Sequence, residues 1–141
     1  MSSHYKNFRR LINILHFAVF ILFLYSAITK SLDFDLFVNT LDKSPFFLNI
    51  NTKAIAIAVI VLEIIIPIFL FFELTSKIGY FLSFFSLFLF TGYILMMMKF
   101  SPYLPCSCGG LIELLSWTQH IYFNIVFMII SALLFFKSSK I

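Results

Sequence analysis

The stretch from residue 54 to residue 72 reads AIAIAVIVLEIIIPIFLFF, and its only charged residue is Glu63. Apolar residues follow one another here without the alternation of a membrane strand. About 20 such residues are needed to cross a bilayer core as a helix. Three similar runs occur elsewhere, so the four candidate spans cover residues 11–28, 54–72, 78–98 and 119–136. The sequence therefore predicts an all-α membrane protein with four transmembrane helices.

The composition supports this class. Hydrophobic residues make up 62% of the 141 residues and charged residues 11%, whereas a soluble domain has about 45–50% and 25%. This excludes a water-soluble enzyme, and the 21 phenylalanines exclude a disordered chain. The net charge of +4 comes mainly from residues that flank the spans, without a basic patch suited to nucleic acid. We expect a single domain over residues 1–141 that contacts the lipid bilayer and no nucleic acid.

The first apolar run follows Lys6, Arg9 and Arg10, as a secretory signal peptide would. It is longer than a signal-peptide core, and residues 25–30 (YSAITK) form a poor cleavage site, so we expect a retained span. Four spans put both termini on one side, and the basic residues before the first span predict that this side is cytoplasmic. The expected location is the bacterial inner membrane, with the loops at 29–53 and 99–116 in the periplasm.

The connections between the spans differ in length. Residues 29–53 contain three aspartates and a proline and are expected to form a long polar loop, whereas residues 73–77 form a tight link. Spans joined by so short a link are expected to be antiparallel neighbours. The third span is rich in phenylalanine, and we expect these rings to contact lipid and pack against neighbours; they are Phe81, Phe84, Phe85, Phe88 and Phe90.

Both cysteines, Cys106 and Cys108, lie in the second long loop, in the sequence Pro-Cys-Ser-Cys-Gly-Gly from 105 to 110. A disulfide needs Cα atoms about 4.4–6.8 Å apart, so a pair two residues apart must bend, which Gly109 and Gly110 make feasible. Such a bridge would be strained, and strained exposed disulfides react readily. It would also stabilise the fold little, because the ring it closes is tiny. The pair is therefore interpreted as catalytic, in redox exchange.

Two other interpretations of the cysteines remain. They could be reduced thiols without a role. They could also bind a soft metal such as Cu(I), with thioether ligands from residues 96–98. Consecutive residues on a helix point in different directions, which disfavours that ligand set. Two cysteines are also too few for a closed zinc site, so no metal is expected.

The fourth span begins with Ser-Trp-Thr-Gln at 116–119, the pattern of a capping box. Trp117 is then expected at the membrane interface. His120 and Asn124 are four residues apart and share a helix face with it. The histidine could handle protons or activate a neighbouring thiol. Alternatively, it is an interfacial histidine bonded to backbone or lipid.

Glu63 lies at the centre of the second span. A carboxylate at this depth is costly, so we expect it to face the bundle interior. It could serve as a proton acceptor or as a ligand for a quinone-like headgroup. It could instead hold helices together by a hydrogen bond to Tyr25, Ser26 or Tyr93. His16, in the first span, is either its partner or an interfacial residue.

Several of these pieces match a known family. They are Leu24-Tyr25-Ser26-Ala27-Ile28-Thr29-Lys30, Leu62-Glu63-Ile64, Pro105-Cys106-Ser107-Cys108-Gly109-Gly110 and Leu115-Ser116-Trp117-Thr118-Gln119-His120. On these residues the chain resembles the MauE/DoxX group of redox-associated four-span membrane proteins. The resemblance implies an up-and-down helical bundle associated with thiol–disulfide exchange or the maturation of exported proteins, often beside a thioredoxin-like partner.

The topology is also similar to that of vitamin K epoxide reductase-like proteins. With one cysteine pair, however, this chain cannot pass electrons internally between two dithiols. Two hypotheses follow. The first is a thiol–disulfide oxidoreductase that exchanges electrons with a thioredoxin-like or exported protein and with a quinone or a partner thiol. The second is a non-catalytic small subunit that scaffolds or stabilises a membrane complex.

Overall fold

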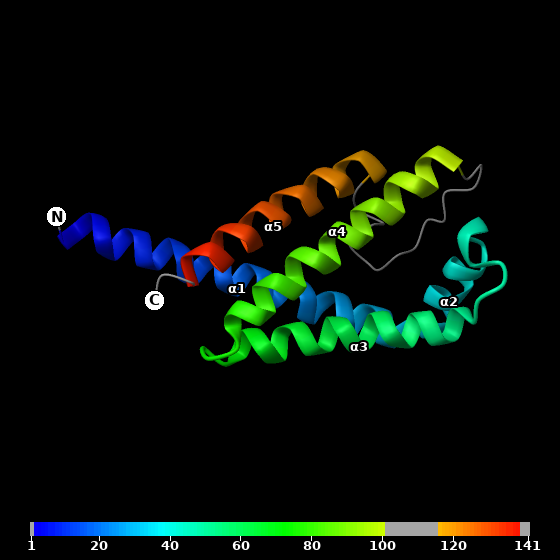
Figure 1. Cartoon of the computed structure of the whole chain (residues 1–141), viewed down its shortest axis with the longest axis horizontal. Coiled ribbons are helices and arrows are strands. Elements are labelled where there is room, and N and C mark those ends of the chain that lie inside the picture. The colour runs from blue at the N-terminus through cyan, green and yellow to red at the C-terminus, as the bar shows by residue number, and fades with distance from the viewer. Residues whose placement is uncertain (1, 101–115, 139–141) are drawn as a thin grey trace.

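A computed structural model describes residues 2–100 and 116–138. It contains α1 (Ser2–Leu32), α2 (Phe34–Asp42), the 3₁₀ helix η1 (Pro45–Phe47), α3 (Thr52–Phe71), α4 (Ser76–Phe100) and α5 (Trp117–Ser138) (Figure 1). No strand occurs in the described ranges. Helices α1, α3, α4 and α5 are long and apolar enough to cross a membrane. The predicted all-α class with four spans is confirmed.

The four long helices form an up-and-down bundle, as the family resemblance implied. Neighbours pack in the order α1–α3, α3–α4 and α4–α5. The start of α1, the end of α5 and the α3–α4 turn lie at one end of the bundle (Figure 1). The other end holds α2, η1, the last turn of α4 and the first turn of α5 (Figure 1). We call it the α2 end.

Helix α1 is longer than its apolar run. It begins at Ser2 and continues to Leu32, past residue 28 where the predicted span stops. The added C-terminal turn includes Lys30, which the sequence placed in an aqueous loop. This turn remains packed in the bundle, because Lys30 is buried.

The prediction of a polar loop over residues 29–53 is wrong for most of its length. The segment instead contains the end of α1, the whole of α2 and η1. Its apolar residues Phe34, Phe37, Val38 and Leu41 recur at helical spacing and give α2 one apolar face. That face packs against α3 around the fully buried Ala56. Helix α2 therefore covers this end of the bundle.

A tight contact holds α3 and α4 together at the opposite end. Gly79 of α4 lies so close to Leu70 of α3 that a Cβ on the glycine would stand 2.7 Å from Leu70 Cδ2. Nearby, His16 Nδ1 and the Tyr80 hydroxyl lie 2.6 Å apart and join α1 to α4. The suggestion that His16 partners Glu63 is therefore wrong.

The phenylalanines of α4 divide into two groups. Four of them are exposed on the bundle surface, as expected of rings that contact lipid: Phe81, Phe84, Phe85 and Phe88. Phe90 differs, because it is half-buried and lines a cavity inside the bundle.

Candidate functional site

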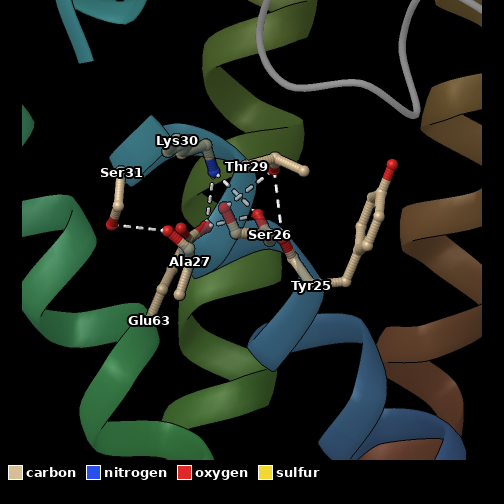
Figure 2. Close-up of polar contacts among 7 residues, drawn as sticks. All are labelled: Tyr25, Ser26, Ala27, Thr29, Lys30, Ser31 and Glu63. Atoms are coloured by element: carbon tan, nitrogen blue, oxygen red, sulfur yellow. Dashed lines mark hydrogen bonds and ion pairs between the residues drawn. The ribbon is translucent and has the colours of Figure 1, made fainter. Parts of the chain in front are cut away.

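A buried ion pair joins α1 to α3 near the α2 end of the bundle. Lys30 Nζ lies 2.5 Å from Glu63 Oε1, and the two residues are only 5% and 1% exposed. Ser26 completes the group, since its hydroxyl donates to Glu63 Oε1 at 3.0 Å and lies 3.0 Å from Lys30 Nζ. Figure 2 shows the three side chains converging from the two helices. The prediction that Glu63 faces the interior is confirmed, with Ser26 as its expected partner.

The local sequence of α1 explains this arrangement. Ser26 and Lys30 are four residues apart and therefore share the face that meets α3. The neighbouring hydroxyls bond to the helix's own carbonyls: Thr29 Oγ1 to those of Tyr25 and Ser26, and Ser31 Oγ to that of Ala27 (Figure 2). These internal bonds let a polar turn lie inside an apolar bundle without leaving hydroxyls unpaired.

Aromatic rings surround the ammonium group. Lys30 Nζ lies 4.5 Å from the centroid of the Phe90 ring and 5.6 Å from that of Phe37. Cations are attracted to the faces of such rings. Together with the carboxylate, the rings offset part of the cost of removing the lysine from water.

The ion pair forms part of the wall of a cavity of about 260 Å³. Segments α1, α2, η1, α3, α4 and α5 all contribute to the lining, which is mostly apolar. Within the part of the chain that the structure describes, its only charged side chains are Lys30 and Glu63, and they neutralise each other. Its aromatic side chains are Phe23, Tyr25, Phe37, Phe47, Phe90, Tyr93 and Phe123.

The start of α5 brings two polar side chains to the same cavity. The predicted capping box is confirmed: Ser116 N donates to Gln119 Oε1 at 3.1 Å, and Gln119 N donates to Ser116 Oγ at 3.3 Å. This start positions His120 and Asn124, which both line the cavity. The His120 ring stacks on Phe123 at 6.4 Å between centroids. Trp117, expected on the same face, is half-buried and lies outside the cavity lining.

Three polar atoms of the cavity residues have no hydrogen-bond partner within residues 2–100 and 116–138. They are Glu63 Oε2, His120 Nδ1 and Asn124 Nδ2. The carboxylate oxygen accepts, the amide nitrogen donates, and the imidazole nitrogen does either according to its tautomer. Buried polar groups are normally satisfied. The cavity therefore combines an unused acceptor and an unused donor within an aromatic lining.

The structure changes the list of site residues that the sequence suggested. It brings Glu63, His120 and Asn124 to one cavity and adds Lys30, which was missed. Two features of the sequence could have identified Lys30 as a site residue. It is four residues from Ser26, and the buried carboxylate of Glu63 needs a counter-ion. Tyr25 and Tyr93, the other partners suggested for Glu63, also line the cavity. Cys106, Cys108, Gly109 and Gly110 lie outside the described residues.

Comparisons with known proteins give one result. No curated protein and no solved structure matches the chain significantly. A family described as methylamine utilisation protein MauE matches residues 9–137. The match includes all four long helices, the cavity residues and the cysteine pair. The chain therefore belongs to the MauE family of membrane proteins.

Proposed function

We propose that this protein is a membrane thiol–disulfide redox protein in which Cys106 and Cys108 exchange electrons with a thioredoxin-like or exported protein. One observation carries the proposal. The cysteine sequence connects α4 to α5, whose facing ends lie at the α2 end of the bundle (Figure 1). Residues of α2 and η1 at this end also line the cavity, whose lining includes the unpaired atoms of Glu63, His120 and Asn124. The sequence that contains the pair therefore begins and ends at the end of the bundle where the cavity lies, which supports a joint role for the cysteines and the cavity. Within methylamine utilisation, the proposed task is disulfide exchange in an exported protein.

The proposed exchange is balanced without a third reactant. A cysteine thiolate attacks the partner's disulfide, so that one S–S bond breaks, a mixed S–S bond forms and a partner thiolate leaves. The second cysteine then attacks the mixed disulfide. The products are a disulfide in this chain and a reduced partner, and the reverse sequence oxidises a partner dithiol.

We also propose that the α2 end faces the periplasm of a bacterial inner membrane. The opposite end of the bundle carries Lys6, Arg9, Arg10, Lys77 and Lys137. The α2 end carries three exposed cations, Lys43, Lys53 and Lys99, and the burial of Lys30 removes a fourth from this end. Basic residues favour the cytoplasmic side. The charge asymmetry therefore supports cytoplasmic termini more strongly than a count along the sequence suggests.

The experiment that tests the function is a redox titration of the purified protein, with alkylated thiols measured by mass. We expect a reversible two-electron transition at a potential well above about −300 mV, the region below which stable structural disulfides lie. The variants Cys106→Ser and Cys108→Ser should differ in cells. The one that retains the attacking thiol should accumulate a mixed disulfide that disappears on reduction.

The double-serine variant is the matched control. It should form no adduct and should lose function. If it retains full function, the protein is instead the non-catalytic subunit of a membrane complex, and the exchange mechanism is wrong.

A further inference from the structure

The cavity itself has the properties of a ligand site. It is lined by α1, α3, α4 and α5, which are long and apolar enough to cross a membrane, so a ligand would enter from the bilayer. Its volume of about 260 Å³ is close to the lower end for ligand pockets, about 300 Å³. That size suits one or two fused rings rather than a whole lipid. The phenylalanine and tyrosine rings of the described lining favour a flat ring.

The charges of the lining restrict the ligand further. Lys30 and Glu63 neutralise each other at 2.5 Å, and among residues 2–100 and 116–138 they are the only charged ones that line the cavity. An anion would be repelled by Glu63 and a cation by Lys30. A neutral ligand has no such conflict.

The unused polar atoms require a ligand that can both accept and donate hydrogen bonds. Asn124 is 3% exposed, and its Nδ2 needs an acceptor; Glu63 is 1% exposed, and its Oε2 needs a donor. An acyl chain would satisfy neither atom. A quinone offers carbonyl oxygens that accept from an amide, and its quinol form offers hydroxyls that donate to a carboxylate. A ligand that changes between these forms would therefore use both atoms.

From these observations we infer that the cavity binds the ring of a membrane-soluble quinone or quinol, with Asn124 and His120 on α5 and Glu63 on α3 as its polar contacts. The inference deepens and rests on the proposed function by naming the class of molecule with which the cysteines would exchange electrons. Oxidation of the dithiol by the quinone breaks two S–H bonds and forms one S–S bond. Two electrons and two protons pass to the ring oxygens and give the quinol. The reverse reaction balances in the same way.

The test measures binding of duroquinone to the protein in phosphatidylcholine nanodiscs by equilibrium dialysis, with empty nanodiscs subtracted. Durene is the matched ligand control, because it has the same ring and methyl groups but lacks both oxygens. All measurements use the Cys106→Ser/Cys108→Ser background. Thiol chemistry then cannot contribute, and the failure of this inference is distinguishable from the failure of the proposed function.

We expect saturable binding of one duroquinone per chain and none of durene. Asn124→Leu, which removes the donor and keeps the volume, should weaken duroquinone binding about five- to tenfold, the loss expected for one buried hydrogen bond. His120→Phe should also weaken duroquinone binding, and this variant is used for the test if Asn124→Leu does not fold. Ser131→Ala is the matched protein control, because this buried residue lies seven positions after Asn124 on α5 and outside the cavity lining. It should bind as the background protein does.

Three results would overturn the inference. The first is the absence of saturable duroquinone binding. The second is equal saturable binding of durene, which would show an apolar cavity that ignores the ring oxygens. The third is unchanged affinity in a folded Asn124→Leu or His120→Phe variant, which would place the ligand elsewhere.

Discussion

Lys30 on α1 and Glu63 on α3 are 33 residues apart in sequence and form a salt bridge of 2.5 Å inside the bundle. The contact fixes the last turns of α1 against the middle of α3. It also forms part of the wall of the cavity, to which α5 contributes His120, Phe123 and Asn124. The stability of the bundle and the shape of the cavity therefore depend on the same pair of charges.

Removing the cation should destabilise the protein strongly. Lys30→Met leaves the Glu63 carboxylate buried without its counter-ion, and breaking a buried pair from one side costs about 3–5 kcal/mol. We expect a clear fall in the midpoint of thermal unfolding, measured by size-exclusion chromatography of heated samples in detergent. Lys53→Met is the matched control, because Lys53 is exposed on α3 and its loss should change little. Equal midpoints for the two variants would show that the salt bridge contributes no stability.

Substitutions of Glu63 should distinguish the contribution of its charge to the stability of the bundle from the contribution of its hydrogen bonds. Glu63→Gln keeps an oxygen that accepts from Ser26 and Lys30, so the bundle should still fold. Glu63→Leu removes that acceptor and leaves Lys30 unpaired, so it should unfold at a lower temperature. Replacing both charges, in Lys30→Met/Glu63→Leu, should restore much of the stability, because buried ion pairs are often replaceable by apolar residues. A double variant as unstable as the sum of the single variants would contradict this coupling.

Gly79, in the first turn of α4, and Gly92, in its interior, should respond in opposite ways to alanine. Gly79→Ala would place a methyl group 2.7 Å and 2.9 Å from Leu70 Cδ2 and Cγ and 3.1 Å from the Leu70 backbone nitrogen. Overpacking of this kind typically costs about 1–3 kcal/mol. Gly92→Ala meets no atom within 4 Å and should be neutral or slightly stabilising, since alanine favours helices over glycine by about 1 kcal/mol. Thermal unfolding of both variants checks this, and a stable Gly79→Ala would mean that α3 and α4 separate easily.

The proposed orientation predicts which thiols a reagent outside the cell can reach. A membrane-impermeant maleimide should label Cys106 and Cys108 in reduced, intact spheroplasts. For the opposite end, Leu74→Cys in the double-serine background places a thiol in the α3–α4 turn at a position 98% exposed. This thiol should react only after permeabilisation. The reverse labelling pattern would place the termini outside.

The sequence predicted the long helices well because their apolar runs are uninterrupted. It also predicted two local features with simple chemistry. The capping box depends on residues three positions apart, and Glu63 has one low-cost environment in a bilayer, the bundle interior. Ser26 was among the expected partners of Glu63 because a hydroxyl is one of the few polar groups near it.

Other features depended on how separate segments meet. Lys30 was assigned to water because it follows the last apolar residues of the first run, and only the path of α3 shows that it is buried. Helix α2 was missed because its aspartates resemble those of a loop, although Phe37 and Leu41 are spaced as on a helix. Phe90 resembles the lipid-facing phenylalanines of α4, and only the positions of α1 and α5 distinguish it from them.

The long separation between Lys30 and Glu63 has a consequence for synthesis. The ribosome makes Lys30 well before Glu63, so α1 reaches the membrane while its lysine has no counter-ion. The ammonium can then remain at the lipid surface on its flexible stem. It gives up that hydration only after α3 has been inserted and has docked beside α1. Insertion of α1 into the membrane and its final packing against α3 are thus separate events in biogenesis. The second event depends on α3, which is translated later.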